Sequence, residues 1–343
     1  MKKITAGIIA IVLVCVMSIS SFGFYSLYQP SDNTPSDNGP PSKFTYVDVT
    51  NVTVSVDLPV NRVVPIMGIE LVVAIGAQDK IVGRSDIDDE GTALLGQSIM
   101  GIPIVGSVEL ILEMEPDLVL VGELYSVADV EILREAGIPV IVDRTVRPRR
   151  SSLISALGVM LGAESKAEEL TSFEAYYENL VHERLKSIPE SEKPVVYFEF
   201  YMPGYSCGPG NSFHDLLIEA GATNMAEEQI PIPIVSTEYV IERNPDIVVR
   251  MLTYLDGLDL DSFIALKDEF TSRAGMGQVN AVKNDKVYIV KNTVIVTRET
   301  IGLLYYAKWF HPDLFTDIDP AAIHAEMIAT FFGAELEGVF SYP

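Results

Sequence analysis

The chain has 343 residues, enough for two domains, and its 48% hydrophobic and 21% charged residues can build sizeable cores. Lys and Arg number 24 against 48 Asp and Glu. The resulting net charge of −24 argues against binding to nucleic acid or to anionic lipid through a basic face. Two cysteines, Cys15 and Cys207, exclude a disulfide framework and a Cys-rich zinc site.

The N-terminus predicts export. Lys2 and Lys3 precede an uncharged, mostly apolar stretch, so residues 1–28 are expected to be a signal sequence or an uncleaved membrane anchor. Cys15 is a candidate for lipid attachment, although Val14 stands where a small residue is expected; the alternative is a buried structural cysteine. The body is therefore expected outside the cytoplasm, tethered to the membrane.

A polar segment follows this stretch. Residues 29–43 are rich in Pro, Ser, Asp and Asn, which predicts a solvated flexible tether. Asn51-Val52-Thr53 then matches an N-glycosylation acceptor, a pattern that is common by chance.

Beyond residue 44, short β-branched runs alternate with helical stretches, which predicts an α/β layered fold. The later runs are continuously apolar, as expected for parallel strands buried on both faces. The expected strands are Tyr46–Val49, Val52–Val56, Val63–Ile66, Asp117–Val121, Pro139–Val142, Val195–Phe200, Asp246–Arg250 and Lys286–Val290.

One long helix is expected at residues 164–189. Ser165 and Glu168 match a capping box, apolar residues follow at helical spacing, and Pro189 ends the pattern. This helix separates an N-terminal lobe (residues 44–163) from a C-terminal lobe (residues 190–343). Each lobe is expected to hold a mainly parallel sheet flanked by helices, and the helix to act as a stiff connection.

An internal repeat indicates that the two lobes are built alike. Residues 107–120 and 236–249 both carry Ser-x-Glu, a second Glu and Pro-Asp in register before an apolar run. Each copy predicts a short helix capped by Ser, a Pro-Asp turn and a buried strand.

With this repeat, the chain resembles the class III substrate-binding proteins of ABC importers, which capture iron–siderophore complexes, haem and corrinoids. Further matching stretches are residues 61–64, 73–83, 102–106, 133–140, 211–224 and 298–312, so the resemblance covers residues 60 to 315. It implies two lobes joined by a rigid helix, with the ligand held in the cleft between them.

The repeated glutamates Glu109 and Glu238 each fall near the second residue of a helix. A carboxylate there is stabilised by the helix dipole, which alone would explain either residue. The resemblance implies that both instead meet arginines of the ABC transporter permease.

Arginines are the main candidates for the ligand-binding cleft. Arg144, Arg147, Arg149 and Arg150 follow an expected strand, at the edge where open α/β sheets bind ligands. Guanidinium groups suit carboxylate, phosphate or catecholate oxygens. The alternative is pairing with local acids such as Asp143. Further candidates are Arg84, Arg250 and Arg298.

Tyrosines offer a second kind of cleft contact. Tyr125, Tyr201, Tyr205 and Tyr254 follow expected strands, where their rings either stack on a planar ligand or pack as cleft walls. The four histidines are scattered, so no metal site is expected.

The sequence and the resemblance together predict an extracytoplasmic receptor of an ABC importer, without catalysis, cofactor or nucleic acid, and monomeric. The expected ligand is a chelated metal, a ferric siderophore-like complex. The alternatives are a corrinoid or haem in the same role, and an extracellular enzyme or interaction protein on the same fold.

Overall fold

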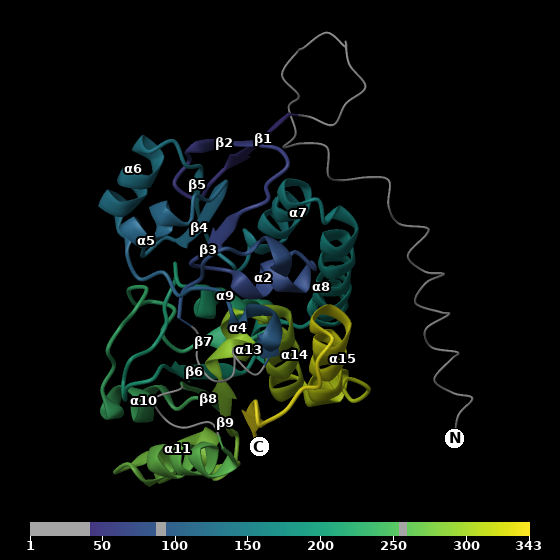
Figure 1. The fold of residues 1–343 in the computed structure, drawn as a ribbon. Coiled ribbons are helices and arrows are strands. Elements are labelled where there is room, and N and C mark those ends of the chain that lie inside the picture. Colours follow the sequence, from purple (N-terminus) through teal and green to yellow (C-terminus); the bar gives the residue numbers. More distant parts are fainter. Residues whose placement is uncertain (1–41, 87–93, 254–258) are drawn as a thin grey trace, which may run out of the picture. The chain divides into compact units, whose positions relative to one another are not determined.

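The first part of the chain forms two small sheets in the computed structural model, which describes residues 42–86, 94–253 and 259–343 (Figure 1). An antiparallel hairpin, β1-β2, comes first, and a parallel sheet in the order β3-β4-β5 follows. The strands are β1 (Lys43–Val47), β2 (Thr53–Asp57), β3 (Val63–Pro65), β4 (Leu118–Gly122) and β5 (Val140–Asp143).

The second part of the chain builds a larger sheet. Its order is β10-β9-β8-β6-β7, and only β10, at one edge, is antiparallel to its neighbour among the described strands. The strands are β6 (Val195–Glu199), β7 (Thr223–Asn224), β8 (Ile247–Leu252), β9 (Val287–Lys291) and β10 (Ser341–Tyr342). Each strand expected from the sequence is confirmed, with bounds shifted by a few residues, as is the α/β class with mainly parallel sheets.

Helices surround the β3-β4-β5 sheet and the five-stranded sheet (Figure 1). Those of the first part are α2 (Ile69–Ala74), α4 (Gln97–Met100), α5 (Val108–Glu113), α6 (Val127–Glu135) and α7 (Arg150–Leu161). Then follow α8 (Glu164–Leu185), α9 (Ser212–Glu219), α10 (Thr237–Arg243), α11 (Leu260–Ser272), α12 (Asn280–Lys283), α13 (Asn292–Val296), α14 (Glu299–Phe310) and α15 (Pro320–Phe332). Single 3₁₀ turns are η2 (Gln78–Lys80), η3 (Glu190–Glu192), η5 (Met276–Gln278) and η6 (Pro312–Leu314).

One apolar core runs through both parallel sheets. It joins Leu120 of β4, Leu157 of α7, Leu170 of α8, Phe198 of β6 and Leu304 of α14. The opposite faces of the two sheets bury clusters of their own, which explains why the strand sequences are apolar at successive positions. Residues 41–343 accordingly form one compact unit.

The long helix α8 lies between the two sheets in sequence and packs against α7 and α14. Its N-cap is Ala163, without a side-chain cap, so the predicted capping box of Ser165 and Glu168 is wrong. The reason is local: Gly162, in the left-handed conformation, ends α7, and the chain turns directly into α8. The helix ends at Leu185, before Pro189. The division into lobes around it stays a prediction.

The repeated Pro-Asp turns have the same structural role in both parts. The Asp117 carboxylate accepts a hydrogen bond from the backbone N–H of Arg62 at 2.9 Å, just before β3. The Asp246 carboxylate accepts one from Val195 at 3.0 Å, at the start of β6. In each sheet the repeated aspartate therefore ties the start of its own strand to the start of a neighbouring parallel strand.

The expected anchor, residues 1–28, and most of the tether, residues 29–43, lie outside the described residues, as do Lys2, Lys3, Cys15 and Tyr254. Lys43, expected to end the tether, begins β1. None of the helices in the described ranges has the length and apolar character needed to span a bilayer.

Candidate ligand-binding residues and docking carboxylates

The carboxyl ends of the parallel strands carry several of the candidate residues. Tyr125 lies three residues beyond the end of β4, Arg144 directly follows β5, and Tyr201 lies just beyond β6. Parallel strands of one sheet end at the same edge, and ligands of open α/β sheets bind there. The structure therefore confirms that these residues follow strand ends, and their contact with a ligand stays a prediction.

Two of the clustered arginines pair with local acids. Arg144 forms an ion pair with Glu123, and this hydrogen bond raises the pKa of Arg144. Arg149 contacts both carboxylate oxygens of Asp143, at 3.0 and 2.7 Å, and donates to the Tyr46 hydroxyl at 3.0 Å. These contacts match the alternative of local pairing, and ligand contact by the cluster stays a prediction.

Arg147 joins parts of the chain that are far apart in sequence. Its guanidinium lies 3.1 Å from Glu178 of α8 and 3.0 Å from Glu219 of α9, and its backbone N–H donates to Glu299 of α14 at 2.8 Å. Burial raises the pKa of Glu219 and of Glu299, and Arg147 offsets part of that effect. Arg150, next along the chain, is buried against Glu174 at 2.7 Å. Arg147, in the turn before α7, and Arg150, the first residue of α7, therefore link this part of the chain to later helices.

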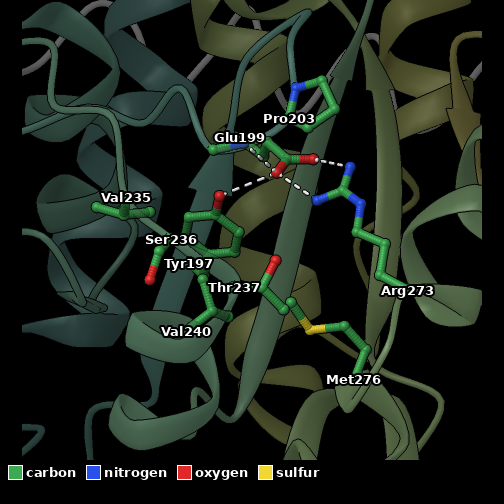
Figure 2. A pocket seen from close by; sticks show the side chains of 10 residues that line it. Tyr197, Glu199, Pro203, Val235, Ser236, Thr237, Val240, Arg273 and Met276 are labelled. Atoms are coloured by element: carbon green, nitrogen blue, oxygen red, sulfur yellow. Dashed lines mark hydrogen bonds and ion pairs between the residues drawn. The ribbon is translucent and has the colours of Figure 1, made fainter.

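A buried ionic network lies beneath the end of β6 (Figure 2). Glu199 is fully buried, and its carboxylate contacts Arg273 at 2.7 and 2.8 Å and Arg250 of β8 at 3.0 Å. It also accepts from the Tyr197 hydroxyl at 3.0 Å and the Gly204 N–H at 2.9 Å. Arg250 thus completes a structural network.

The same network borders a small pocket of about 190 Å³ (Figure 2). Its walls come from β6, the loop after β6, the start of α10 and η5. They consist of Tyr197, Glu199, Pro203, Gly204, Val235, Ser236, Thr237, Val240, Arg273 and Met276.

The remaining two arginines differ in their surroundings. Arg298 is buried, 3.4 Å from Glu70 of α2 and 3.2 Å from Nε2 of His324. Arg84 is partly buried and donates to the Ser85 carbonyl at 3.0 Å, and among the described residues its Nε atom has no hydrogen-bond partner. Of the arginines predicted for the cleft, Arg84 is therefore the one with no acidic partner in the described ranges.

Two tyrosines form a stacked pair beyond β6. The Tyr201 ring is 48% exposed and stacks on Tyr205, with ring centroids 6.2 Å apart and an interplanar angle of 26°. Gly204, with φ of +81°, makes the turn between them, and an added Cβ would lie 2.6 Å from the Val235 carbonyl oxygen. Tyr125 is only partly exposed, and its pKa is raised by burial and by Asp129. Tyr201 is therefore the most accessible of these three rings, while Tyr205 is partly buried beneath the stack.

The two repeated glutamates share one local geometry. Glu109 of α5 and Glu238 of α10 are both exposed second residues of their helices. In each helix the N-cap serine, Ser107 or Ser236, accepts a hydrogen bond from the backbone. The residue's own backbone N–H and the cap hydroxyl lower the pKa of each glutamate. Both carboxylates are therefore charged and accessible, while their contact with a permease stays a prediction.

The sequence patterns did not identify Glu199, Arg273, Glu219 or Glu299 as network residues. One signal was present, since Glu199 is a charged residue at the end of the otherwise apolar run of β6. A buried carboxylate requires a cation close by. No group of three or more His, Cys, Asp or Glu side chains suited to a metal ion occurs within the described ranges.

Comparison with known proteins places this architecture in a family. Residues 67–294 match the family model described as periplasmic binding protein. The uncharacterized ABC transporter substrate-binding lipoprotein YvrC of Bacillus subtilis is 27% identical over 335 residues, which cover 92% of this chain and 100% of that protein. A cobalamin-binding protein of Halobacterium salinarum is 25% identical over 306 residues, 86% of this chain and 79% of that protein.

Among solved structures, the TroA-like periplasmic binding protein FepB from Veillonella parvula superposes with a TM-score of 0.75 at 26% identity, covering 87% of this chain and 99% of that one. The family match covers well over half of the chain. The chain therefore belongs to the periplasmic binding protein family, and its role is that of an ABC-importer substrate-binding protein rather than an enzyme.

Proposed function

We propose that this receptor captures a corrinoid and delivers it to its ABC permease. The observation that carries the proposal is the exposed Tyr201 stacked on the partly buried Tyr205 at the carboxyl end of β6. Aromatic faces favour a large planar ring system, because stacking buries much apolar area at once. The likeness to a cobalamin-binding protein supports the same ligand class.

The charge balance also supports a ligand without strong negative charge. Arg144, Arg147, Arg149, Arg250 and Arg298 each lie within ion-pair distance of a carboxylate. Binding a multiply anionic complex through them would require breaking those pairs. The net charge of −24 adds a general repulsion of anions. We therefore place a corrinoid ahead of the anionic iron complex expected from the sequence.

A ferric siderophore-like complex is the second candidate, favoured by Arg84. Its side chain meets a carbonyl oxygen, and its Nε is unpartnered among the described residues. A guanidinium with spare donors suits an anionic oxygen of a chelator. In this case Arg84, and not the tyrosine pair, would dominate affinity.

The proposed working arrangement is an exported monomer held at the outer face of the membrane through its N-terminus. The basic start, the apolar stretch and Cys15 support this location, as does the likeness to a protein named as a lipoprotein. Glu109 and Glu238, one in each copy of the repeat, are the proposed contacts to permease arginines. The ligand would be bound between the two parallel sheets and released without chemical change.

Titration of the full-length protein with cyanocobalamin, haemin and a ferric hydroxamate tests the ligand. Tyr201→Ala should weaken corrinoid binding by about 1 kcal/mol, roughly fivefold in Kd. Tyr176→Ala, at a 56% exposed tyrosine of α8, is the matched control and should bind normally. Binding of the ferric complex alone, with a loss in Arg84→Met, would replace the corrinoid by the second candidate. Failure of all three ligands on folded protein would contradict both.

A further inference from the structure

The turn between β1 and β2 presents a compact and well-braced hairpin tip. Asp48, only 1% exposed, accepts hydrogen bonds on Oδ1 from the backbone N–H of Thr50 at 2.9 Å and of Val52 at 3.1 Å. Its other oxygen pairs with Arg134 at 3.0 Å. The buried Asp48 carboxylate therefore holds the backbone of the turn in place through hydrogen bonds.

Asn51 is at this tip, in a conformation suited to asparagine. Its φ is +63°, a left-handed turn that Asn tolerates better than most residues. Asn51, Val52 and Thr53 are all exposed. Within the described ranges, neither the side-chain amide of Asn51 nor the hydroxyl of Thr53 forms a hydrogen bond. Both functional groups of the acceptor sequence are therefore available to a modifying enzyme.

No second copy of this acceptor pattern occurs in the 343-residue sequence, because every other Asn lacks Ser or Thr two positions later. A single chance match would fall with equal ease inside a helix or a buried strand. Here it falls on an exposed turn, where N-glycosylation acceptors are found in exported proteins. The position of the match is thus an observation independent of the match itself.

We propose that Asn51 is an N-glycosylation site whose donor is an oligosaccharide linked to a lipid phosphate or diphosphate. In the step, Nδ2 of Asn51 forms a bond to C1 of the first sugar and gives up one proton to a base of the modifying enzyme. The bond from C1 to the phosphate oxygen breaks, and the lipid phosphate or diphosphate leaves. The inference rests on the proposed extracytoplasmic location, because such transfer takes place on exported chains.

A glycan at this tip would also cover exposed apolar surface. Val47 is 50% exposed at the end of β1, and Val52 is 39% exposed in the turn. Within the described residues no third strand pairs with the outer edge of β2, and such edges are sites of unwanted pairing. A bulky hydrophilic group beside them would hinder association between copies.

The test is the mass of the full-length protein isolated from membranes of the cells that naturally make it. Wild-type protein and Thr53→Ser, which keeps the acceptor pattern, should carry an added oligosaccharide mass. Asn51→Asp, which tolerates the left-handed backbone, and Thr53→Val should lack it. Thermal melting confirms that the variants fold. An unmodified wild type, or an added mass that survives Asn51→Asp, would overturn the inference.

Protease accessibility of the chain in intact cells separates this inference from the proposed location. An accessible chain with unmodified Asn51 refutes the glycosylation site and leaves the receptor role intact. A chain protected inside the cell refutes the location and, with it, the modification.

Discussion

Replacing Glu199 by glutamine should destabilise the protein strongly, because this carboxylate is the centre of a buried ionic network. Glutamine keeps the size of the side chain and one acceptor for Tyr197 or Gly204. It removes the negative charge that faces Arg273 at 2.7 and 2.8 Å and Arg250 at 3.0 Å. Arg250 is 3% exposed as a side chain, so its charge would be left poorly compensated.

Breaking a buried ion pair by removing one partner costs about 3–5 kcal/mol. Glu269 still contacts both arginines, so we expect the lower end, about 3 kcal/mol. At about 2.1 cal/mol/K of unfolding entropy per residue, that is a fall in Tm of roughly 4–5 °C for a chain of this size. Urea unfolding followed by circular dichroism, with calorimetry for Tm, measures both quantities.

The matched control is Glu227→Gln, an exposed glutamate in the same part of the chain, which should change stability by less than about 0.5 kcal/mol. Adding Arg250→Met to Glu199→Gln should recover part of the loss, because the lone buried charge is then removed. A loss below about 1 kcal/mol in Glu199→Gln would refute the reasoning, since it would mean that the arginines are compensated by solvent.

Two further predictions concern docking and pH. The double variant Glu109→Ala/Glu238→Ala should keep its ligand affinity and lose uptake in transport assays. The control Glu113→Ala, at an exposed acid on the same helix as Glu109, should transport normally. Lost ligand affinity in the double variant would contradict a docking role. Burial lowers the pKa of His324 from 6.5 to about 3, so the unfolded state takes up its proton first and stability is lost as the pH falls below about 6.5. Between about pH 7 and pH 5, protonation of this residue should lower the free energy of unfolding by about 2 kcal/mol. Urea unfolding at the two pH values should show this loss in the wild type and in His182→Gln but not in His324→Gln. The same pH dependence in all three proteins would refute the prediction.

The strands were predictable from sequence because burial on both faces leaves a continuous apolar run, as in Ile247–Leu252. The short helices of the repeat were predictable because each cap serine acts on a backbone N–H three residues along the chain. The hydrogen bonds of the repeated aspartates were not, since their partners lie 55 and 51 positions earlier. The capping box of α8 was not, since Ser165 matches the pattern but Gly162 brings the preceding helix to within two residues of the next. Tertiary context decided the start of this helix.

The partners of the arginines could not be predicted, because they are remote in sequence. Arg298 meets Glu70, 228 positions away, and Arg147 meets Glu219 of a later helix. Local patterns show that a guanidinium is at a strand end but not which carboxylate the fold brings to it. In an acidic chain many acids compete for few cations, so pairing within the protein was favoured over free cations in a cleft.

The core shared by both parallel sheets limits how the protein can be divided. Cutting the chain before or after α8 would expose apolar faces of Leu157, Leu170 and Leu304 that now contact one another through a single cluster. Neither fragment would retain the surface that completes its interior. The two parallel sheets thus share one interior, and fragments of the chain are expected to be poor substitutes for the intact protein in binding experiments.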